Sequence, residues 1–317
     1  MLVGYPPSDL MVVSPNDTWS VTEASSRPHF WAIHPGISRD GNLVATARLT
    51  GDIVPRKDDL GIVRQEWRAS IAIFSIQQKT WAEYGQINDA SSFQGSVAIA
   101  PDGSKLAFAE ADARRTPIVR VHVIELKNRT EKIIAANGLH GGTTLSWAPD
   151  GRRLVYDTMP KNYHEGATKY LPGIEVLDME TGKSIKIANG EHPAWSPSSE
   201  WIAYEDPSVT FTRDRIDSNT MHIRYRGSRL MLVRPDGTDS RVLLLLGRDG
   251  LLGFLFSIYR SLAMAPVWSP DSKTLLLNEW GDIDAAKMDI YLLDLATLKM
   301  TRKFNRTTPV YGWAEAK

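Results

Sequence analysis

Hydrophobic and polar positions follow one pattern in five separate segments of the chain. Each segment has an apolar residue, a small residue, a tight turn and then a strand in which apolar and polar residues alternate. The turn is often Pro-Asp-Gly, in which proline presets φ and glycine accepts a positive φ. This pattern predicts a β-hairpin in each segment. The five segments are ISRDGNLVATA from Ile37, IAPDGSKLAFAE from Ile99, WAPDGRRLVYDT from Trp147, WSPSSEWIAYED from Trp195 and WSPDSKTLLLNE from Trp268.

A second predicted hairpin follows each of these segments, starting near Ala69, Ile118, Gly173, Ser228 and Met288. Two hairpins in succession make a four-stranded antiparallel sheet, whose strands we call A, B, C and D in chain order. The motif starts at 37, 99, 147, 195 and 268 are separated by 62, 48, 48 and 73 residues. Propeller blades recur every ~40 to 50 residues, so the two long intervals require insertions.

The two ends of the chain carry further strand patterns. TPVYGWAEAK at the C-terminus aligns Trp313 with Trp268 and predicts one more strand A. DLMVVSPNDTWSVTEA near the N-terminus predicts a C–D hairpin, and Met1 to Tyr5 is a weak candidate for strand B. Pairing of the two ends would remove free sheet edges. We therefore expect an all-β, six-bladed propeller formed by a single domain, 1–317, with its sixth blade built from 309–317 and 1–23. Five blades, or a defective sixth, is the alternative.

The motifs WAPDGRRLVY and WSPDSKTLLL resemble the repeat of TolB-like propellers, which also occurs in the propeller domains of the prolyl oligopeptidase family. The resemblance covers nearly the whole chain. It implies a propeller that acts through protein partners at the bacterial envelope, and so a periplasmic or extracytoplasmic location. TolB carries an additional N-terminal α/β domain that this chain does not match. The chain also contains no nucleophile-elbow sequence of a hydrolase domain.

Composition narrows the range of functions. Lys plus Arg equals Asp plus Glu, at 37 each, so no overall field attracts nucleic acid, and we expect no nucleic-acid partner. The chain has no cysteine, which excludes disulfides, thiolate catalysis and cysteine metal sites. The first residues do not resemble a secretory signal. The longest apolar stretch, 242–267, contains Arg248, Asp249 and Arg260, so we expect no transmembrane segment.

Strand order predicts which face of the propeller carries the insertions. The A–B and C–D turns lie on one face and are short, whereas the B–C loops and D–A crossovers lie on the other. The long connections are 48–68, 158–172, 206–227 and 247–264, and all of them fall on this second face, which we call the loop face. Long loops on a rigid scaffold commonly carry binding sites, although neutral variation also lengthens loops.

Two segments of the loop face are candidate partner-binding sites. The crossover LLGFLFSIY is unusually apolar and could contact a partner or a membrane surface, or form a short helix that caps the channel. The 206–227 loop combines arginine and tyrosine, which are favoured at interfaces, but it could equally be a solvated charged loop. The candidate residues are Leu251, Leu252, Phe254, Phe256, Tyr259, Arg213, Arg215, Arg224, Tyr225 and Arg226.

Polar residues recur at the loop-face ends of the strands. The ends of strands B carry Glu110, Asp157, Glu205 with Asp206, and Glu279. They could form an acidic rim around the channel mouth, or cap backbone amides and pair with arginine. His34 and His192 occupy equivalent positions in blades one and four and could face each other across the channel. Two histidines without an identified carboxylate partner do not make a metal site, so we predict neither a metal nor a cofactor.

These observations favour a non-catalytic scaffold module that binds a protein or peptide over the loop face. The first alternative is a hydrolase or lyase with its site at the channel mouth, although the sequence identifies no catalytic residue. The second alternative is a structural subunit of a larger assembly. The apolar segment 251–259 also leaves peripheral membrane contact open.

Overall fold

The computed structural model describes residues 2–3, 11–13, 19–21, 35–57, 63–87, 96–111, 118–137, 143–158, 172–213, 223–246, 265–280, 288–306 and 310–313. Every regular element in these ranges is a β-strand. None of the described residues belongs to a helix that could cross a membrane.

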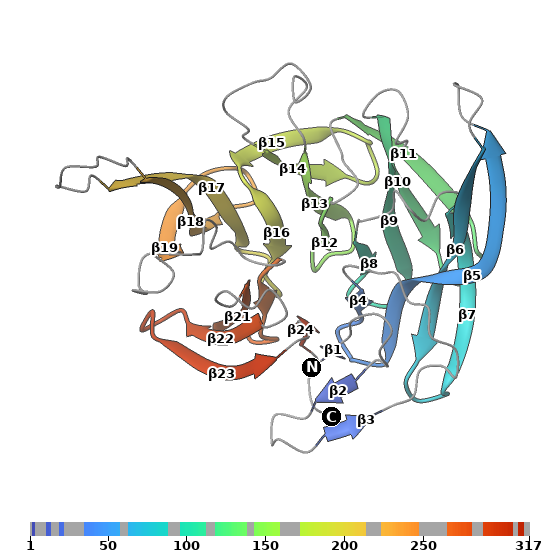
Figure 1. The fold of residues 1–317 in the computed structure, drawn as a ribbon, viewed down its shortest axis with the longest axis horizontal. Coiled ribbons are helices and arrows are strands. Elements are labelled where there is room, and N and C mark those ends of the chain that lie inside the picture. Colours follow the sequence, from blue (N-terminus) through green and yellow to red (C-terminus); the bar gives the residue numbers. More distant parts are fainter. Residues whose placement is uncertain are drawn as a thin grey trace.

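Five four-stranded antiparallel blades are arranged around a ring (Figure 1). Blade 1 contains β4 (Gly36–Ile37), β5 (Leu43–Lys57), β6 (Val63–Ser75) and β7 (Thr80–Ile87), and blade 2 contains β8 (Val97–Ile99), β9 (Lys105–Ala111), β10 (Ile118–Glu125) and β11 (Glu131–Asn137). Blade 3 contains β12 (Leu145–Trp147), β13 (Arg153–Thr158), β14 (Gly173–Asp178) and β15 (Ser184–Asn189). Blade 4 contains β16 (Glu191–Trp195), β17 (Ile202–Arg213), β18 (Ile223–Val233) and β19 (Arg241–Leu246), and blade 5 contains β20 (Val267–Trp268), β21 (Thr274–Trp280), β22 (Met288–Asp294) and β23 (Met300–Arg306).

The two ends of the chain meet in a much smaller sheet. It contains β1 (Leu2–Val3), β2 (Met11–Val13), β3 (Trp19–Val21) and β24 (Val310–Gly312), in the order β24-β1-β2-β3. In each of the five blades the three outer strands have six or more residues, whereas no strand of this terminal sheet exceeds three. The prediction of a six-bladed propeller is therefore wrong: the structure has five blades, because the terminal patterns pair over too few residues to build another.

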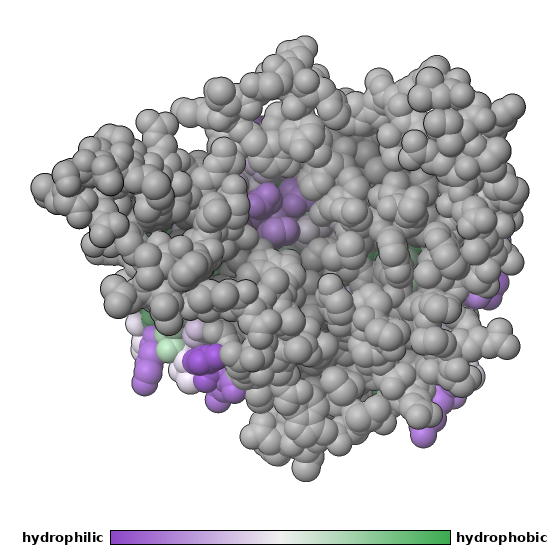
Figure 2. All heavy atoms as spheres, in the orientation of Figure 1, coloured by the Kyte–Doolittle hydropathy of each residue, from purple (hydrophilic) through white to green (hydrophobic). Residues whose placement is uncertain are grey.

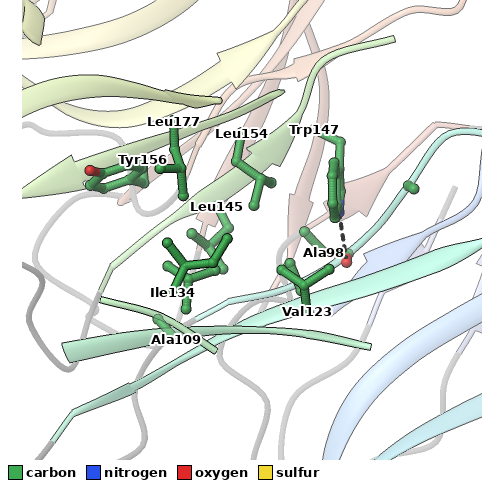
Figure 3. Close-up of a cluster of buried hydrophobic side chains, with 12 residues drawn as sticks. Ala98, Ala109, Val123, Ile134, Leu145, Trp147, Leu154, Tyr156 and Leu177 are labelled. Carbon is green, nitrogen blue, oxygen red and sulfur yellow. Dashed lines mark hydrogen bonds between the residues drawn. The ribbon is translucent and has the colours of Figure 1, made fainter. Parts of the chain in front are cut away.

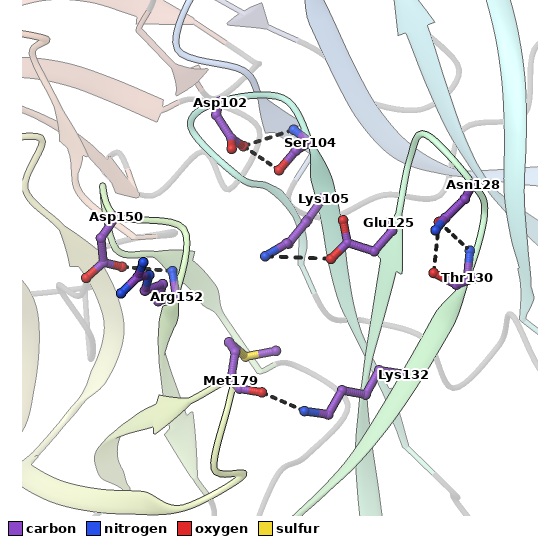
Figure 4. Close-up of polar contacts among 10 residues, drawn as sticks. All are labelled: Asp102, Ser104, Lys105, Glu125, Asn128, Thr130, Lys132, Asp150, Arg152 and Met179. Carbon is purple, nitrogen blue, oxygen red and sulfur yellow. Dashed lines mark hydrogen bonds and ion pairs between the residues drawn. The ribbon is translucent and has the colours of Figure 1, made fainter.

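The tight turns between strands A and B follow the chemistry expected from the motif. Asp102 accepts a hydrogen bond from the backbone N–H of Ser104 at 2.9 Å, and Gly103 has a φ of 71° (Figure 4). In blades 4 and 5 this position is held by Ser199 and Ser272, with φ of 65° and 59°. The turn geometry is therefore retained even where glycine is replaced, because the aspartate or serine side chains around it satisfy the backbone.

The hydrophobic core lies between successive blades. Between blades 2 and 3, Trp147 packs among apolar side chains from both blades, and its indole Nε1–H donates a hydrogen bond to the carbonyl oxygen of Ala98 at 3.1 Å (Figure 3). Trp268 repeats this bond to Ala194 at 3.0 Å. Trp195 is equally buried, but its Nε1 has no acceptor among the described residues. The recurring tryptophans thus join neighbouring blades.

Two of the expected B–C loops are largely strand. Beyond a register shift at Leu49, residues 53–57 of β5 pair with 63–67 of β6. Beyond another at Asp206, residues 209–213 of β17 pair with 223–227 of β18. We call these extensions the blade 1 arm and the blade 4 arm. Each has five residue pairs and so extends by roughly 15 Å. Figure 1 shows them on opposite sides of the ring.

The three tryptophans allow the hydrogen bond to be separated from packing. We expect Trp147→Phe and Trp268→Phe to lower the free energy of unfolding by about 0.5–1.5 kcal/mol more than Trp195→Phe does, because only the first two lose a hydrogen bond of the indole. Chemical denaturation of the three variants measures the difference. Equal losses would contradict a stabilising role for the indole hydrogen bond.

Candidate functional site

A cavity of about 250 Å3 runs along the axis of the ring. Its walls are the inner strands of the five blades, and Trp313 from the end of the chain also lines it. At the turn end its lining includes four prolines of the A–B turns: Pro101, Pro149, Pro197 and Pro270. At the loop-face end, Thr144 and Pro193 line it. Asp157 and His192 adjoin these two residues. Figure 2 shows hydrophilic residues in a hollow near the middle of the molecule.

The inner strand of blade 4 begins with an irregular backbone. β16 pairs with β17 at Glu191 and again from Ala194, with a register shift between them. His192 lies in this bulge with a φ of 56°, which is uncommon for a residue other than glycine. Gly190 lies directly before β16. A Cβ at this position would lie 2.5 Å from the carbonyl oxygen of Glu205, so a larger residue does not fit without a shift. Bulges redirect side chains, and here the bulge brings Glu191 and His192 toward β17.

Asp157, at the end of β13, connects this bulge to blade 3. Its Oδ1 accepts a hydrogen bond from the backbone N–H of Thr144 at 2.8 Å, and its Oδ2 accepts one from the backbone N–H of His192 at 3.0 Å. The carboxyl group is buried, with 1% of the residue exposed. Asp157 therefore fixes the backbone of His192 from the neighbouring blade.

Three side chains converge around this bulge. His192 Nδ1 lies 3.4 Å from Glu205 Oε2, and one ligand atom from each of Glu191, His192 and Glu205 lies within 4.8 Å of the others. The Glu205 side chain is fully buried at 0% exposure, whereas the His192 side chain is 21% exposed. We call Glu191, His192 and Glu205 the mouth cluster. In this cluster the Glu205 side chain is buried, whereas the His192 side chain is accessible to solvent.

Burial and neighbouring charges shift the proton affinities in the mouth cluster. Burial raises the pKa of Glu191 to about 7; the charge of His192 opposes this, and the carboxyl groups of Glu205 and Asp157 add to it. Burial lowers the pKa of His192, but the contact with Glu205 and the nearby Glu191 and Asp157 outweigh it and raise the pKa to about 9. His192 is therefore an imidazolium at neutral pH, and Glu191 titrates in the physiological range.

Comparison with known proteins bears on the fold. No family model matches the chain, and no curated protein matches it. TolB from Acinetobacter baumannii superposes with a TM-score of 0.61 at 12% identity, over 98% of this chain and 66% of that chain. A putative TolB from Agrobacterium tumefaciens gives a TM-score of 0.57 at 14% identity, over 93% and 89%. The chain has a TolB-like β-propeller fold.

The TolB-like propeller fold does not by itself define a function. A chain from a nidogen/laminin complex superposes equally well, with a TM-score of 0.57 at 14% identity, over 98% of this chain and 95% of that chain. Identities this low establish the architecture alone. The function therefore has to be argued from the residues of this propeller.

The structure brings together three of the residues that the sequence suggested for the channel mouth: Asp157, His192 and Glu205. Asp206, next to Glu205, instead forms an ion pair with Arg229, with 2.5 Å between Oδ2 and Nη2. The side chains of Glu110 and Glu279 lie outside the described residues, as do His34, Arg215, the side chains of Arg213, Arg224, Tyr225 and Arg226, and all of 251–259.

Glu191 was not among the residues predicted from the sequence. It stands at the start of β16, where the repeat contains no other acid, and it faces Glu205 only because of the backbone bulge. The one local signal is that His192 precedes Pro193, since proline restricts the backbone of the residue before it. The bulge itself depends on Gly190 and on the contact of His192 with blade 3, which is distant in sequence.

The raised pKa of Glu191 gives a pH-dependent prediction. We expect Glu191→Gln to raise the free energy of unfolding relative to the wild type more at pH 8 than at pH 5. The folded-state pKa of about 7 exceeds the ordinary 4.5, so the wild type loses stability as the pH rises from about 4.5 through 7, whereas glutamine does not ionise.

Urea unfolding at both pH values measures this difference. Glu200→Gln, at an exposed turn, is the control and should show the same effect at both pH values. An effect of Glu191→Gln that does not change between pH 5 and pH 8 would contradict the assignment.

Proposed function

We propose that this chain is a non-catalytic recognition module that binds a protein or peptide across its loop face. The observation that carries the proposal is the pair of arms. Strands B run toward the loop face, so both arms extend from the same face on which the inner strands begin. The mouth cluster lies on that face between them.

Paired strands are suited to recognition because their backbone is ordered before a partner arrives. A preformed contact surface reduces the conformational entropy lost on binding. Each arm belongs to the same two strands as its blade, and its pairing resumes beyond the register shift at its base. The register pairs Thr212 with Arg224 and Thr210 with Arg226 in the blade 4 arm, so the arm includes candidate residues suggested by the sequence.

An enzyme is the second candidate, and one observation supports it. Glu191 has a pKa of about 7, which suits a general acid or base near neutral pH, and it precedes by two residues Pro193, which lines the central cavity. His192 is protonated at that pH and would act as a cation or acid rather than as a base. We place recognition first because the arms are large, paired features of the face, whereas a reaction would need a substrate pose that orients these groups.

The proposal predicts that contacts are concentrated on the arms. A photo-reactive benzoylphenylalanine at Thr212, in the blade 4 arm, should form adducts with a partner in source-cell extract. The same residue at Thr181, in an exposed C–D turn of the opposite face, should not. Replacing residues 209–227 by a two-residue turn should reduce partner capture about tenfold or more, as loss of an interface hot spot does.

Retention of the fold in the shortened variant is checked by circular dichroism. Equal adducts from Thr181 and Thr212, or capture that survives removal of the arm, would overturn the proposed role of the loop face. Turnover of a small molecule that is abolished by Glu191→Gln would favour the enzyme instead.

A further inference from the structure

We infer that the mouth cluster is a binding site for a divalent first-row transition-metal ion, with Zn2+ as the representative ion. Glu191, His192 and Glu205 would each supply one ligand atom. The inference is independent of the proposed recognition function, because it rests on the geometry of the cluster and not on the arms.

The separations match those around such an ion. Zn2+ binds imidazole nitrogen and carboxylate oxygen at about 2.0–2.2 Å in tetrahedral geometry, so two donors of one ion lie roughly 3.3 Å apart. His192 Nδ1 and Glu205 Oε2 are separated by 3.4 Å. The third donor, from Glu191, lies within 4.8 Å of both. Because Glu191 is only partly buried, a small side-chain rotation would bring it into the same sphere.

The surrounding structure restricts the positions of two of the three ligands, as a metal site requires. Glu205 lies on β17 with its side chain fully buried, so its carboxyl group has a restricted position. Asp157 fixes the backbone of His192 through the hydrogen bond at 3.0 Å. Residues that orient the ligands contribute strongly to metal affinity, and Asp157 would do so through the backbone rather than through the ion.

The cluster also has an accessible side. His192 is 21% exposed and Glu191 is partly exposed, so an ion can enter from the loop face. Three protein ligands with a solvent-accessible fourth position form the arrangement of exchangeable or catalytic zinc sites rather than of closed structural ones.

The donor set discriminates between classes of metal. Ca2+ and Mg2+ prefer six or more oxygen ligands, whereas an imidazole nitrogen suits Zn2+ and its neighbours in the first transition row. We therefore expect Zn2+ and Co2+ to bind and Ca2+ to compete poorly. No metal site was predicted from the sequence because His192 was paired with His34, Glu191 was missed, and nothing in the repeat placed Glu205 next to His192.

The test is calorimetric titration of the intact metal-free protein with Zn2+ at pH 8, where less His192 is protonated than at pH 7. We expect one site that is weakened about tenfold or more by each of Glu191→Gln, His192→Gln and Glu205→Gln, since each removes a ligand. Glu200→Gln, an exposed glutamate on an A–B turn, is the matched control and should leave binding unchanged. Co2+ should give a visible absorption band that His192→Gln removes.

Several outcomes would overturn the inference. Zn2+ affinity and stoichiometry that are unchanged in all three variants would place any bound ion elsewhere in the chain. Ca2+ binding as tight as Zn2+ binding would contradict the assigned metal class. Because Glu205 is buried, Glu205→Gln could disturb the fold; Glu191→Gln, at a partly exposed position, then decides the question, and unchanged binding in that variant counts against the site.

Discussion

The contact between one blade and the next is the interaction on which the rest of this molecule depends. Each blade presents apolar side chains to its neighbour, and the interfaces are closed near the axis by the recurring tryptophans. The indole of Trp147 both fills the interface and donates to the carbonyl of Ala98. Large aromatic side chains supply much of the energy of packed cores, and a directed hydrogen bond adds a fixed geometry. This geometry sets the positions of the inner strands and so the width of the central cavity.

The polar site at the channel mouth uses the same interface between blades. Asp157 in blade 3 binds the backbone of His192 in blade 4, so the site exists only when the two blades are docked. A buried carboxyl group destabilises the folded protein unless it is hydrogen-bonded. Both carboxyl oxygens of Asp157 accept a hydrogen bond. The positive φ of His192 is a local strain that the surrounding contacts maintain. The packing of blade 3 against blade 4 therefore also builds the site.

The sequence was sufficient to predict the repeating hairpins, the strand order and the role of the tryptophans, because each depends on local alternation and turn chemistry. Blade size at the chain ends was predicted wrongly, since three-residue runs such as Met11–Val13 carry no information on how far pairing extends. The arms were expected as loops because their bulges interrupt the alternation that marks a strand. Glu191 could not be found because its proximity to Glu205 arises from a backbone register shift, which periodicity does not encode.

The small sheet at the ends of the chain has a consequence for the mechanics of the ring. β1 pairs with β24 through Leu2 with Gly312 and Val3 with Val310, so a few backbone contacts between the most distant parts of the chain close the circle. Bringing these two segments together costs conformational entropy in the unfolded chain, and this cost is smaller once the folded blades hold the segments near each other. The pairing of β1 with β24 is consequently the contact that closes the ring. A pulling force applied to both ends would act on this contact first, and its rupture would let the blades unfold one after another rather than together.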